Sequence, residues 1–383
     1  MKSVRWAALV VLAVALLTAG CGASNSGTGS GTSAGSSSAT PRQPPVPPDA
    51  TVDGMPGGSY RGSARTSSAD WDKVVEAANR EGTLTVYSNQ NPDTTCPQQK
   101  VAFEKAYPSI KVDFLCGLPN GDIKIDAEQK GGKKIADIDI SSDLGFMQDH
   151  KDYWTPLRGP NIIDSSTIKK WTGPAEAPLW TLYGFQIIAY AWNTDLIKGR
   201  PTLKQLLTDG QYKSMPNAML DFTQDTNEAY GVWLIGQSYD KTFNDPNFVQ
   251  LSADARARLM IGLNQGMQAL SAGQYAWTSF TAKAFVPRDA PIEVGFLDKP
   301  PAPLTLMALT RDSPHPNAAQ VFANWAMTRE AQEISATDSG SALPGISTSL
   351  FDASQVTLYN LPAFSKQQLL DLQAYQKQVF GIN

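Results

Sequence analysis

The sequence predicts an α/β fold in which helices pack on a parallel sheet, extended over two domains. Runs of β-branched and aromatic residues alternate with helix-like segments, a pattern that indicates a parallel sheet covered by helices. About 310 residues follow a low-complexity N-terminal region, which is enough for two domains. No internal repeat is visible, and no second apolar segment is long enough to cross a membrane.

The first 21 residues resemble an export signal. Lys2 and Arg5 precede an apolar run from Trp6 to Leu17, which is short for a membrane span. Small residues then lead to Cys21, an order that resembles the bacterial lipobox, whose cysteine is acylated and becomes the mature N-terminus. Two or three acyl chains would hold the protein on a membrane almost permanently. The alternative is an ordinary secretory peptide with an incidental Cys21.

Residues 22–69 are rich in Ser, Gly, Thr, Pro and Ala and contain almost no large apolar side chains. Such a segment buries too little surface to offset its ordering entropy. We expect a disordered tether that the prolines between Pro41 and Pro48 stiffen. Folding on a partner is the alternative.

The first part of the folded region reads as strand, helix, strand, helix, strand after an opening helix. Asp70 or Ser68 can cap that helix and Gly82 ends it. The expected elements are a helix over 71–80, a strand over 84–87, a helix ending at Tyr107 before Pro108, and strands over 110–115 and 135–140.

The second part continues the alternation. The expected elements are strands over 185–192 and 218–222, helices opening at 202–207 and 229–235, a helix from Ser252 to about Leu270, strands over 292–296 and 305–309, and a helix from Pro316 to about Met327.

Two cysteines, Cys96 and Cys116, remain beside Cys21. Export would place them in an oxidising compartment. Cys96 precedes a predicted helix and Cys116 ends a predicted strand, so both lie at the carboxyl edge of the expected sheet. A disulfide is therefore geometrically reasonable, and it would stabilise the fold by about 3 kcal/mol. Two free buried thiols are the alternative.

The composition and the absence of known motifs exclude several classes of function. A net charge of −4 argues against a nucleic-acid partner. The two histidines, His150 and His315, have no partner at metal-ligand spacing and read as surface residues. The chain has no Gly-x-Ser-x-Gly elbow, no P-loop and no glycine-rich dinucleotide turn. We therefore expect no catalytic residues, no cofactor and no bound metal.

Three strands are followed by a polar loop that enters a helix. Helix N-termini expose unpaired N–H groups, and open α/β sheets bind ligands at the carboxyl ends of their strands. Loops of this kind that face one cleft would surround a small polar molecule with hydrogen-bonding groups. The alternative is that these residues only cap their own helices. The residues concerned are Ser88, Asn89 and Gln90; Ser141, Ser142 and Asp143; and Thr223, Gln224, Asp225 and Thr226.

A fourth candidate combines aromatic rings with hydroxyl groups, which is common in small-ligand pockets. It comprises Trp277, Thr278, Ser279, Phe280 and Thr281. An aromatic core strand explains the same residues equally well. Tyr183 and Trp180, just before the long strand, are further candidates for a cleft.

Several segments together resemble one family, the ferric-iron-type extracellular solute-binding proteins of ABC importers, which also includes thiamine and aminoethylphosphonate binders. The similar segments are VVEAANREGTLTVYSNQ, FEKAYPSIKV, ADIDISSD, IIAYAWNTDLI, MQALSAGQY and DSPHPNAAQVFANWAMTREAQE. Each is weak alone, but their order and spacing over residues 71–345 are fairly specific.

The resemblance implies a two-lobed type II periplasmic-binding fold, in which each lobe is a mixed, mostly parallel sheet flanked by helices and crossing strands join the lobes. We expect residues 70–187 and 293–325 in lobe 1, and residues 188–292 and 326–383 in lobe 2. It also implies a lipid-anchored, monomeric protein on the extracytoplasmic face, with an ABC permease as partner. The ligand loops carry over to Ser88 and Asn89, Ser141 to Asp143, Thr223 to Thr226, and Trp277 to Thr281.

One departure from the family concerns iron. Ferric-binding members place paired tyrosines in the late loop, whereas this loop reads YAWTSFTAKAF with Tyr275 alone. Neutral donors suit an oxyanion or a zwitterion, and Asp143 and Asp225 could pair with an ammonium group. We expect capture of such a solute by lobe closure. The alternatives are a ferric-iron carrier, a secreted hydrolase that recruits His150 or His315, and a ligand sensor.

Overall fold

The protein is described by a computed structural model that covers residues 42–45, 51–52, 68–117, 121–163, 179–359 and 364–382. The predicted signal peptide and Cys21 lie outside these residues. None of the helices within them is both long and apolar enough to span a membrane.

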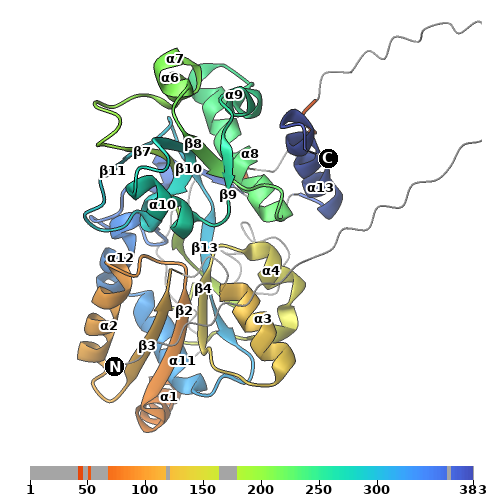
Figure 1. The fold of residues 1–383 in the computed structure, drawn as a ribbon. Coiled ribbons are helices and arrows are strands. Elements are labelled where there is room, and N and C mark those ends of the chain that lie inside the picture. Colours follow the sequence, from red (N-terminus) through yellow and green to blue (C-terminus); the bar gives the residue numbers. More distant parts are fainter. Residues whose placement is uncertain are drawn as a thin grey trace, which may run out of the picture. The chain divides into compact units, whose positions relative to one another are not determined.

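A seven-stranded mixed sheet organises the first part of the chain (Figure 1). Its strands are β2 (Thr83–Ser88), β3 (Lys111–Cys116), β4 (Ile138–Ser141), β5 (Trp154–Thr155), β6 (Trp180–Phe185), β13 (Leu304–Thr310) and β14 (Gly340–Ser341). β2 pairs in parallel with β3 and β4, whereas β13 runs antiparallel to β4, β5 and β6. The carboxyl ends of β2 and β4 therefore meet at one edge of the sheet.

Helices cover this sheet, and we call the sheet and its helices the first lobe. They are α1 (Ser68–Glu81), α2 (Thr95–Ala106), α3 (Gly121–Gly131), α4 (Leu144–Asp149), α11 (Pro316–Ala326) and α12 (Arg329–Ser335), with 3-10 turns η1 (Lys151–Tyr153) and η3 (Ala336–Asp338). The expected helices over 71–80 and 316–327 and the strands over 84–87 and 110–115 are confirmed.

A five-stranded mixed sheet, in the order β11-β7-β10-β8-β9, organises the second lobe. Its strands are β7 (Ile188–Asn193), β8 (Asn217–Leu220), β9 (Arg258–Met260), β10 (Trp277–Ala282) and β11 (Ile292–Gly295). The elements around it are α6 (Leu203–Thr208), α7 (Gly210–Lys213), α8 (Thr226–Phe243), α9 (Phe248–Asp254), α10 (Leu263–Ser271), α13 (Lys366–Val379) and η2 (Lys283–Phe285).

Two stretches of chain connect the sheets. Gln186 and Ile187 lead from β6 to β7, and residues 296–303 lead from β11 to β13. The connections lie side by side, since Gln186 N donates to Pro303 O at 2.9 Å. The single strand expected over 185–192 is therefore wrong, because its uninterrupted apolar residues belong to two strands in different sheets.

A three-stranded sheet, β1-β15-β12, lies on the second connection. It comprises β1 (Thr51–Val52), β12 (Pro301–Ala302) and β15 (Thr357–Tyr359), and the 3-10 turn η4 (Ala353–Gln355) precedes β15. β1 belongs to the segment that we expected to be an unstructured tether.

The helix expected from Ser252 to Leu270 is wrong. The chain there forms α9, β9 and α10 instead. Arg256 and Gly262 have positive φ angles of 54° and 76°, which end helical geometry on both sides of β9. β9 then pairs with β8, so sheet pairing overrides the helical propensity of this segment.

The lobe boundaries expected from the sequence remain a proposal, but two short strands bear on them. β14 pairs with β6 in the first sheet, although it follows residue 326. β11 pairs with β7 in the second sheet, although the first lobe was expected to resume at residue 293.

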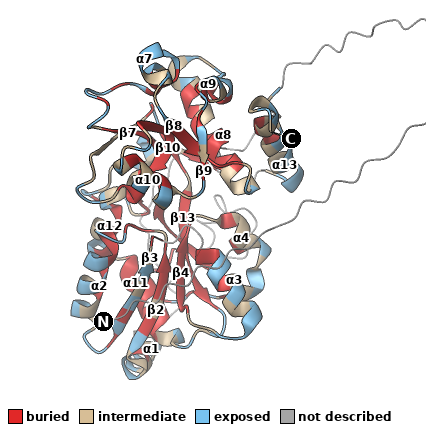
Figure 2. Ribbon diagram, viewed as in Figure 1, coloured by how far each residue is buried: buried red, intermediate tan, exposed pale blue. Residues whose placement is uncertain are grey.

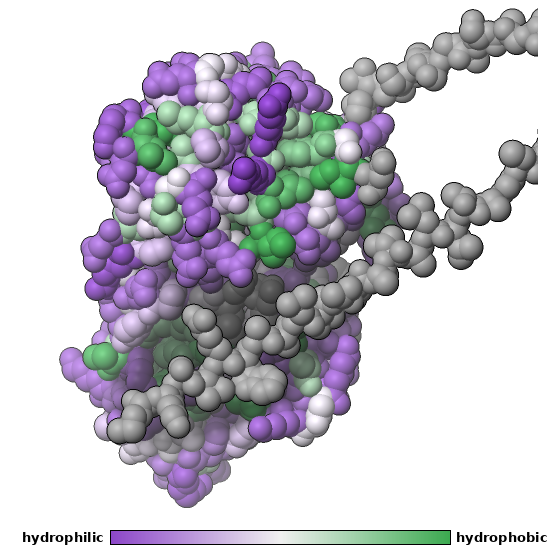
Figure 3. All heavy atoms as spheres, viewed as in Figure 1, coloured by the Kyte–Doolittle hydropathy of each residue, from purple (hydrophilic) through white to green (hydrophobic). Residues whose placement is uncertain are grey.

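Each sheet has its own buried core. The central strands of both sheets are buried, whereas the edge strands β3, β9 and β11 are partly exposed, and exposed residues gather on the outer faces of the helices (Figure 2). Phe103, Trp180 and Phe322 lie in the first core, and Trp192, Phe222 and Trp277 lie in the second. The side chains visible in Figure 3 are mainly hydrophilic, with smaller groups of hydrophobic residues between them. Two separate cores fit two bodies that can move about the connections.

Candidate ligand-binding site

The loops that follow β2 and β4 meet, as the sequence predicts. Asn89 Nδ2 donates to Ser142 Oγ at 3.1 Å, and Ser142 Oγ lies 3.1 Å from Thr305 Oγ1 of β13. Asn89 N also donates to Ile140 O, which fixes the first loop on the second. Asn89 and Ser142 are half-buried and Thr305 is buried, so together they form a polar floor.

Ser88 and Ser141 lie at the same edge but hold the loops rather than face a ligand. Ser88 Oγ accepts from Gln90 N at 3.1 Å, and Ser141 Oγ accepts from Asp143 N at 3.0 Å. Both side chains are buried. These two hydroxyl groups therefore accept hydrogen bonds from backbone N–H groups of their own loops, which was the alternative to ligand binding.

A polar cavity lies beside this floor. Tyr183 OH donates to Gln90 Oε1 at 3.2 Å and accepts a hydrogen bond from Gln99 Nε2. The cavity encloses about 360 Å³ of space, part of which is open to solvent. Its walls include Asn89, Gln90, Asn91, Thr95, Tyr183, Gln186, Ala284, Thr305, Ser335, Asp338 and Ser339. Ala284 comes from the second lobe, so the cavity lies where the lobes and their connections meet.

Asp143 links the two lobes directly. It caps α4 by accepting from Phe146 N at 2.9 Å, and its other oxygen accepts from Asn227 Nδ2 of α8 at 2.8 Å. Asp225, in turn, caps α8 by accepting from Glu228 N at 2.9 Å. The polar loop before α8 therefore reaches the polar loops of the first lobe.

The rest of the loop before α8 is organised by Asp221. Its Oδ1 accepts from Thr223 Oγ1 at 2.5 Å, and its Oδ2 accepts from Gln224 Nε2 at 2.9 Å. Thr223 and Thr226 are half-buried, while Asp225 is exposed. Asp225 and Thr226 therefore remain accessible beside the contact between Asp143 and Asn227.

Carboxyl groups from both lobes gather around that contact. Burial, and then the charge of Asp143, raises the pKa of Asp122 to about 7. Burial, followed by the charges of Asp225, Asp221 and Asp143, raises the pKa of Glu228 to about 7. Burial also raises the pKa of Asp143 itself, although its hydrogen bond from Phe146 N opposes the shift. The charges that act most strongly on these groups are thus other carboxylates.

Asp122 and Asp139 form a buried pair behind the loop after β4. Ser141 Oγ donates to Asp122 Oδ2 at 3.0 Å, whereas Asp122 Oδ1 and Asp139 Oδ2 are buried without a hydrogen-bond partner in the described part of the chain. Complete burial, together with the charge of Asp122, raises the pKa of Asp139 well above its usual range. Burial and the charge of Asp122 therefore favour the protonated form of Asp139, since two neighbouring buried carboxylates repel each other.

A second contact region between the lobes surrounds the disulfide. Cys96 and Cys116 are joined, which confirms that prediction, with Cα atoms 6.6 Å apart. Next to the bridge, Asn264 Nδ2 donates to Gly117 O, and Arg288 Nη2 donates to Asp93 O at 2.9 Å. Because Asn264 and Arg288 belong to the second lobe, the bridged loop forms part of the lobe-to-lobe contact.

The fourth candidate group lies inside the second lobe. Trp277, Thr278 and Ser279 of β10 are each at most 1% exposed. Trp277 Nε1 donates to Tyr212 O at 3.0 Å, and Thr278 Oγ1 bonds within its own strand. This segment is therefore a buried core strand, which was the alternative to a pocket wall in the sequence analysis.

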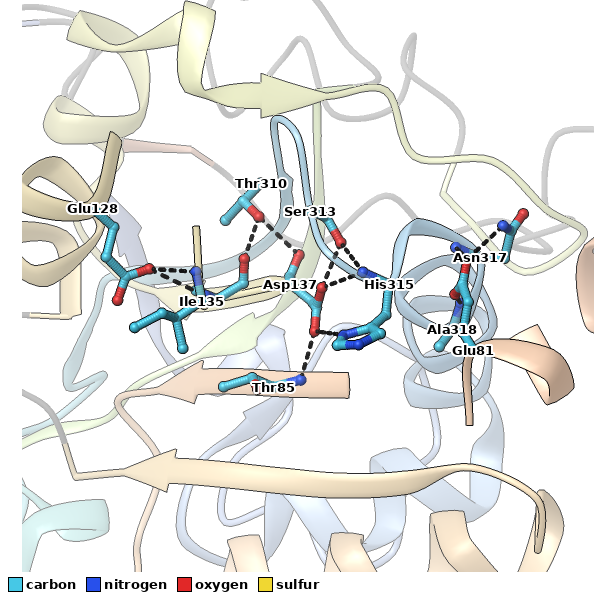
Figure 4. A network of polar contacts seen from close by, with 11 residues as sticks. Glu81, Thr85, Glu128, Ile135, Asp137, Thr310, Ser313, His315, Asn317 and Ala318 are labelled. Atoms are coloured by element: carbon cyan, nitrogen blue, oxygen red, sulfur yellow. Dashed lines mark hydrogen bonds and ion pairs between the residues drawn. The ribbon is translucent and has the colours of Figure 1, made fainter. Parts of the chain in front are cut away.

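His315 has a partner that the sequence did not reveal (Figure 4). Its Nδ1 lies 3.0 Å from Asp137 Oδ2, which also accepts from Thr85 N at 2.7 Å. Ser313 Oγ donates to Asp137 Oδ1 at 2.5 Å, so this serine bonds to the acid rather than the imidazole. The cluster precedes β4, at the opposite end of that strand from the candidate site. It fastens the start of α11 and lacks the geometry of a Ser-His-Asp triad.

Within the described ranges, no group of three or more His, Cys, Asp or Glu side chains has the geometry of a metal site. Sequence reasoning missed Asn227, Thr305 and the acids Asp122 and Asp139. The sequence did contain one signal for a buried polar cluster, because Asp137 and Asp139 lie in an otherwise apolar strand. A buried carboxyl group requires a partner.

Comparison with known proteins gives a likeness of fold. No family model matches the chain, and no curated protein matches it. Among solved structures, the substrate-binding protein of an ABC transporter from Agrobacterium tumefaciens is 16% identical with a TM-score of 0.60, covering 79% of this chain and 96% of that one.

Two further structures are similar. A spermidine/putrescine ABC transporter substrate-binding protein from Streptococcus pneumoniae is 14% identical with a TM-score of 0.53, covering 78% of this chain and 99% of that one. A periplasmic binding protein from Actinobacillus pleuropneumoniae with bound fructose-6-phosphate is 18% identical with a TM-score of 0.51, covering 78% and 97%. The chain therefore has the two-lobed type II periplasmic-binding fold, as its sequence predicts.

Proposed function

We propose that the protein is the substrate-binding component of an ABC importer and that it captures a small polar solute between its lobes. The observation that carries the proposal is the contact between Asp143 and Asn227, which brings the polar loops of the two sheets together. Open α/β sheets bind ligands at the carboxyl ends of their strands, and Asn89, Ser142 and Asp143 follow two such ends. The fold shared with importer components supports the same conclusion.

Charge favours a solute with a cationic group. Asp143 of the first lobe and Asp221, Asp225 and Glu228 of the second act on one another electrostatically. Closing the lobes around these groups brings like charges together, which an ammonium group would offset. The N–H groups at the start of α8 and the amide of Asn89 can receive an anionic end. A zwitterion or a small amine therefore fits better than a simple oxyanion.

Entry of the solute requires the lobes to separate. Hydrogen bonds from Asn227, Asn264 and Arg288 of the second lobe hold them together. In an open form these bonds exchange with water, and a ligand that touches both lobes shifts the population toward closure. The closed form is then the one that a permease recognises.

We also propose that the chain is exported, acylated at Cys21 and held as a monomer on the extracytoplasmic face of the membrane. The order of charges, apolar residues and small residues before Cys21 supports this assignment. Metabolic labelling with a palmitate analogue, compared between the wild type and Cys21→Ser, tests it.

The ligand hypothesis is tested by thermal unfolding of the full-length protein against amines, zwitterions, oxyanions and Fe³⁺. We expect stabilisation by a compound with an ammonium group, and affinity about 10- to 100-fold weaker in Asp143→Asn, as loss of a charged hydrogen bond predicts. Asp152→Asn, an exposed acid in η1, is the matched control. Stabilisation by Fe³⁺ alone would favour the iron-carrier alternative, and no stabilisation by any compound would refute the proposal.

A further inference from the structure

A groove of about 1060 Å³, part of which is open to solvent, lies on the second lobe away from the candidate ligand-binding site. Its walls come from α7 with the chain up to β8, and from the turn between α9 and β9. Asn217 and Arg258, the first residues of β8 and β9, both line it, so the groove lies at the amino ends of these strands. The loop that Asp221 organises follows the carboxyl end of β8, roughly 13 Å further along the strand.

Cationic side chains dominate this groove. Lys213, Arg256 and Arg258 line it together with one acid, Asp254. Asp254 Oδ1 accepts a hydrogen bond from Gln250 Nε2 at 2.9 Å. No ion pair joins the three cations to another residue of the described ranges, and the ion pairs found in the second lobe lie elsewhere. The groove therefore carries a local net charge of +2, although the whole chain carries −4.

The turn after α9 presents the two arginines. Arg256 has a φ angle of 54°, a left-handed conformation that is uncommon for a residue with a side chain. Arg256 N donates to Ala253 O at 2.8 Å and Ala257 N donates to Ser252 O at 3.1 Å, and these bonds close the turn. Ala257 is buried, whereas Arg256 and Arg258 on either side of it are exposed. The backbone therefore holds both guanidinium groups outside the core, where they line the same groove.

A buried amide joins the two walls of the groove. Asn217 Nδ2 donates to Met215 O at 3.1 Å and to Ala255 O at 2.8 Å, so one side chain fastens the loop before β8 to the turn after α9. Asn217 is 3% exposed, and its Oδ1 accepts no hydrogen bond from any residue in the described part of the chain. A hydroxyl group of a ligand or an ordered water would satisfy that oxygen. Because the walls are already fixed, little freedom is lost when a ligand binds between them.

We propose that this groove binds the phosphate group of a small organic phosphate, at a second site apart from the one that captures the transported solute. Guanidinium groups bind phosphate oxygens through paired N–H donors, and Lys213 adds a third positive charge. The phosphate headgroups of lipids share this chemistry, but a concave groove fits a small molecule better than a flat membrane surface. The proposal does not depend on the capture of a solute between the lobes.

Isothermal titration calorimetry of the full-length protein with glycerol 3-phosphate and with inorganic phosphate, at constant ionic strength, tests the site. We expect a dissociation constant of about 1 mM or lower in the wild type. The double variant Arg256→Asn with Arg258→Gln should bind at least about tenfold more weakly, because two charged hydrogen-bond donors are lost. Asn tolerates the left-handed conformation at position 256, so the turn is retained. Lys241→Gln removes an exposed cation of α8 outside the groove and should bind like the wild type.

Vesicles of phosphatidylglycerol, compared with vesicles of phosphatidylcholine, separate the two sources of phosphate, and the Cys21→Ser protein is used so that acylation does not contribute. We expect no preference for phosphatidylglycerol. Such a preference without binding of either soluble phosphate would overturn the proposal, as would equal affinity in the wild type and the double variant, or no binding at all. Arg258→Gln alone, with an expected weakening of about threefold, decides the question if the double variant unfolds. Failure leaves the proposed capture of a solute untouched, because no residue of the groove belongs to the candidate ligand-binding site.

Discussion

Replacing Asp122 by Asn tests the buried acid pair behind the loop after β4. In the folded protein the pKa of Asp122 is raised to about 7, whereas an exposed aspartate titrates near 3.9. Asn keeps the acceptor for Ser141 Oγ and adds a donor toward Asp139. The variant thus preserves the shape of the pair and removes the ionisation of one group.

The direction of the pH dependence follows from the number of protons that the folded and unfolded states bind. Below about pH 4 Asp122 is protonated in both the folded and the unfolded state, so its raised pKa does not change the free energy of unfolding. Between about pH 4 and pH 7 the unfolded chain loses the proton while the folded protein retains it, so the free energy of unfolding falls as pH rises. One group changes the slope by about 1.4 kcal/mol per pH unit. A shift of about three pH units sets an upper limit near 4 kcal/mol, and electrostatic coupling to the titration of Asp139 reduces it.

Urea unfolding at intervals between pH 4.5 and pH 8 measures this difference. We expect Asp122→Asn to match the wild type near pH 4.5 and to be more stable by about 2–4 kcal/mol at pH 8. Asp152→Asn should run parallel to the wild type. A constant difference between Asp122→Asn and the wild type at every pH would refute a raised pKa of Asp122 in the folded protein.

Two further substitutions probe the contacts between the lobes. Asn227→Asp places a carboxylate against Asp143, so we expect lower protection of amides in the first turns of α4 and α8 at pH 8 than at pH 5, with exchange compared with the intrinsic rate at each pH. Asn227→Ala adds no charge and should lack this pH contrast in protection, and its presence there would contradict the explanation. Replacing Cys96 and Cys116 by Ser should lower the free energy of unfolding by about 3 kcal/mol relative to the oxidised wild type, measured by urea unfolding, with the reduced wild type as a control that matches the variant; no difference from the oxidised wild type would contradict a structural role.

The order of strands and helices from α1 to β4 was predictable because local patterns determine it. Thr83 to Ser88 is a β-rich run followed by polar residues and a helix, and this local order placed Asn89 at the carboxyl edge of the sheet. The same reasoning placed Ser142 and Asp143 at that edge. Since parallel neighbours share an edge, their meeting followed from the fold class.

Tertiary contacts were not predictable in the same way. Asn227 reaches Asp143 across the lobes, and no local pattern indicates a partner 84 residues away. Trp277 and Thr278 combine an aromatic ring with a hydroxyl, a pair that suits both a pocket and a buried strand, and only burial distinguishes the two. Arg258 to Met260 carries helical propensity but pairs with β8, because the positive φ angles of Arg256 and Gly262 end helical geometry on both sides of it.

Native mass spectrometry of the full-length protein, purified without added ligand, tests most directly whether loops of both lobes hold one solute. We predict a single small bound species of positive or zwitterionic character in the wild type, retained in Asp152→Asn and lost when Asp143 and Asp225 are both replaced by Asn. A bound species whose retention is unchanged in that double variant would contradict the account, because the ligand would then lie away from the contact between the lobes.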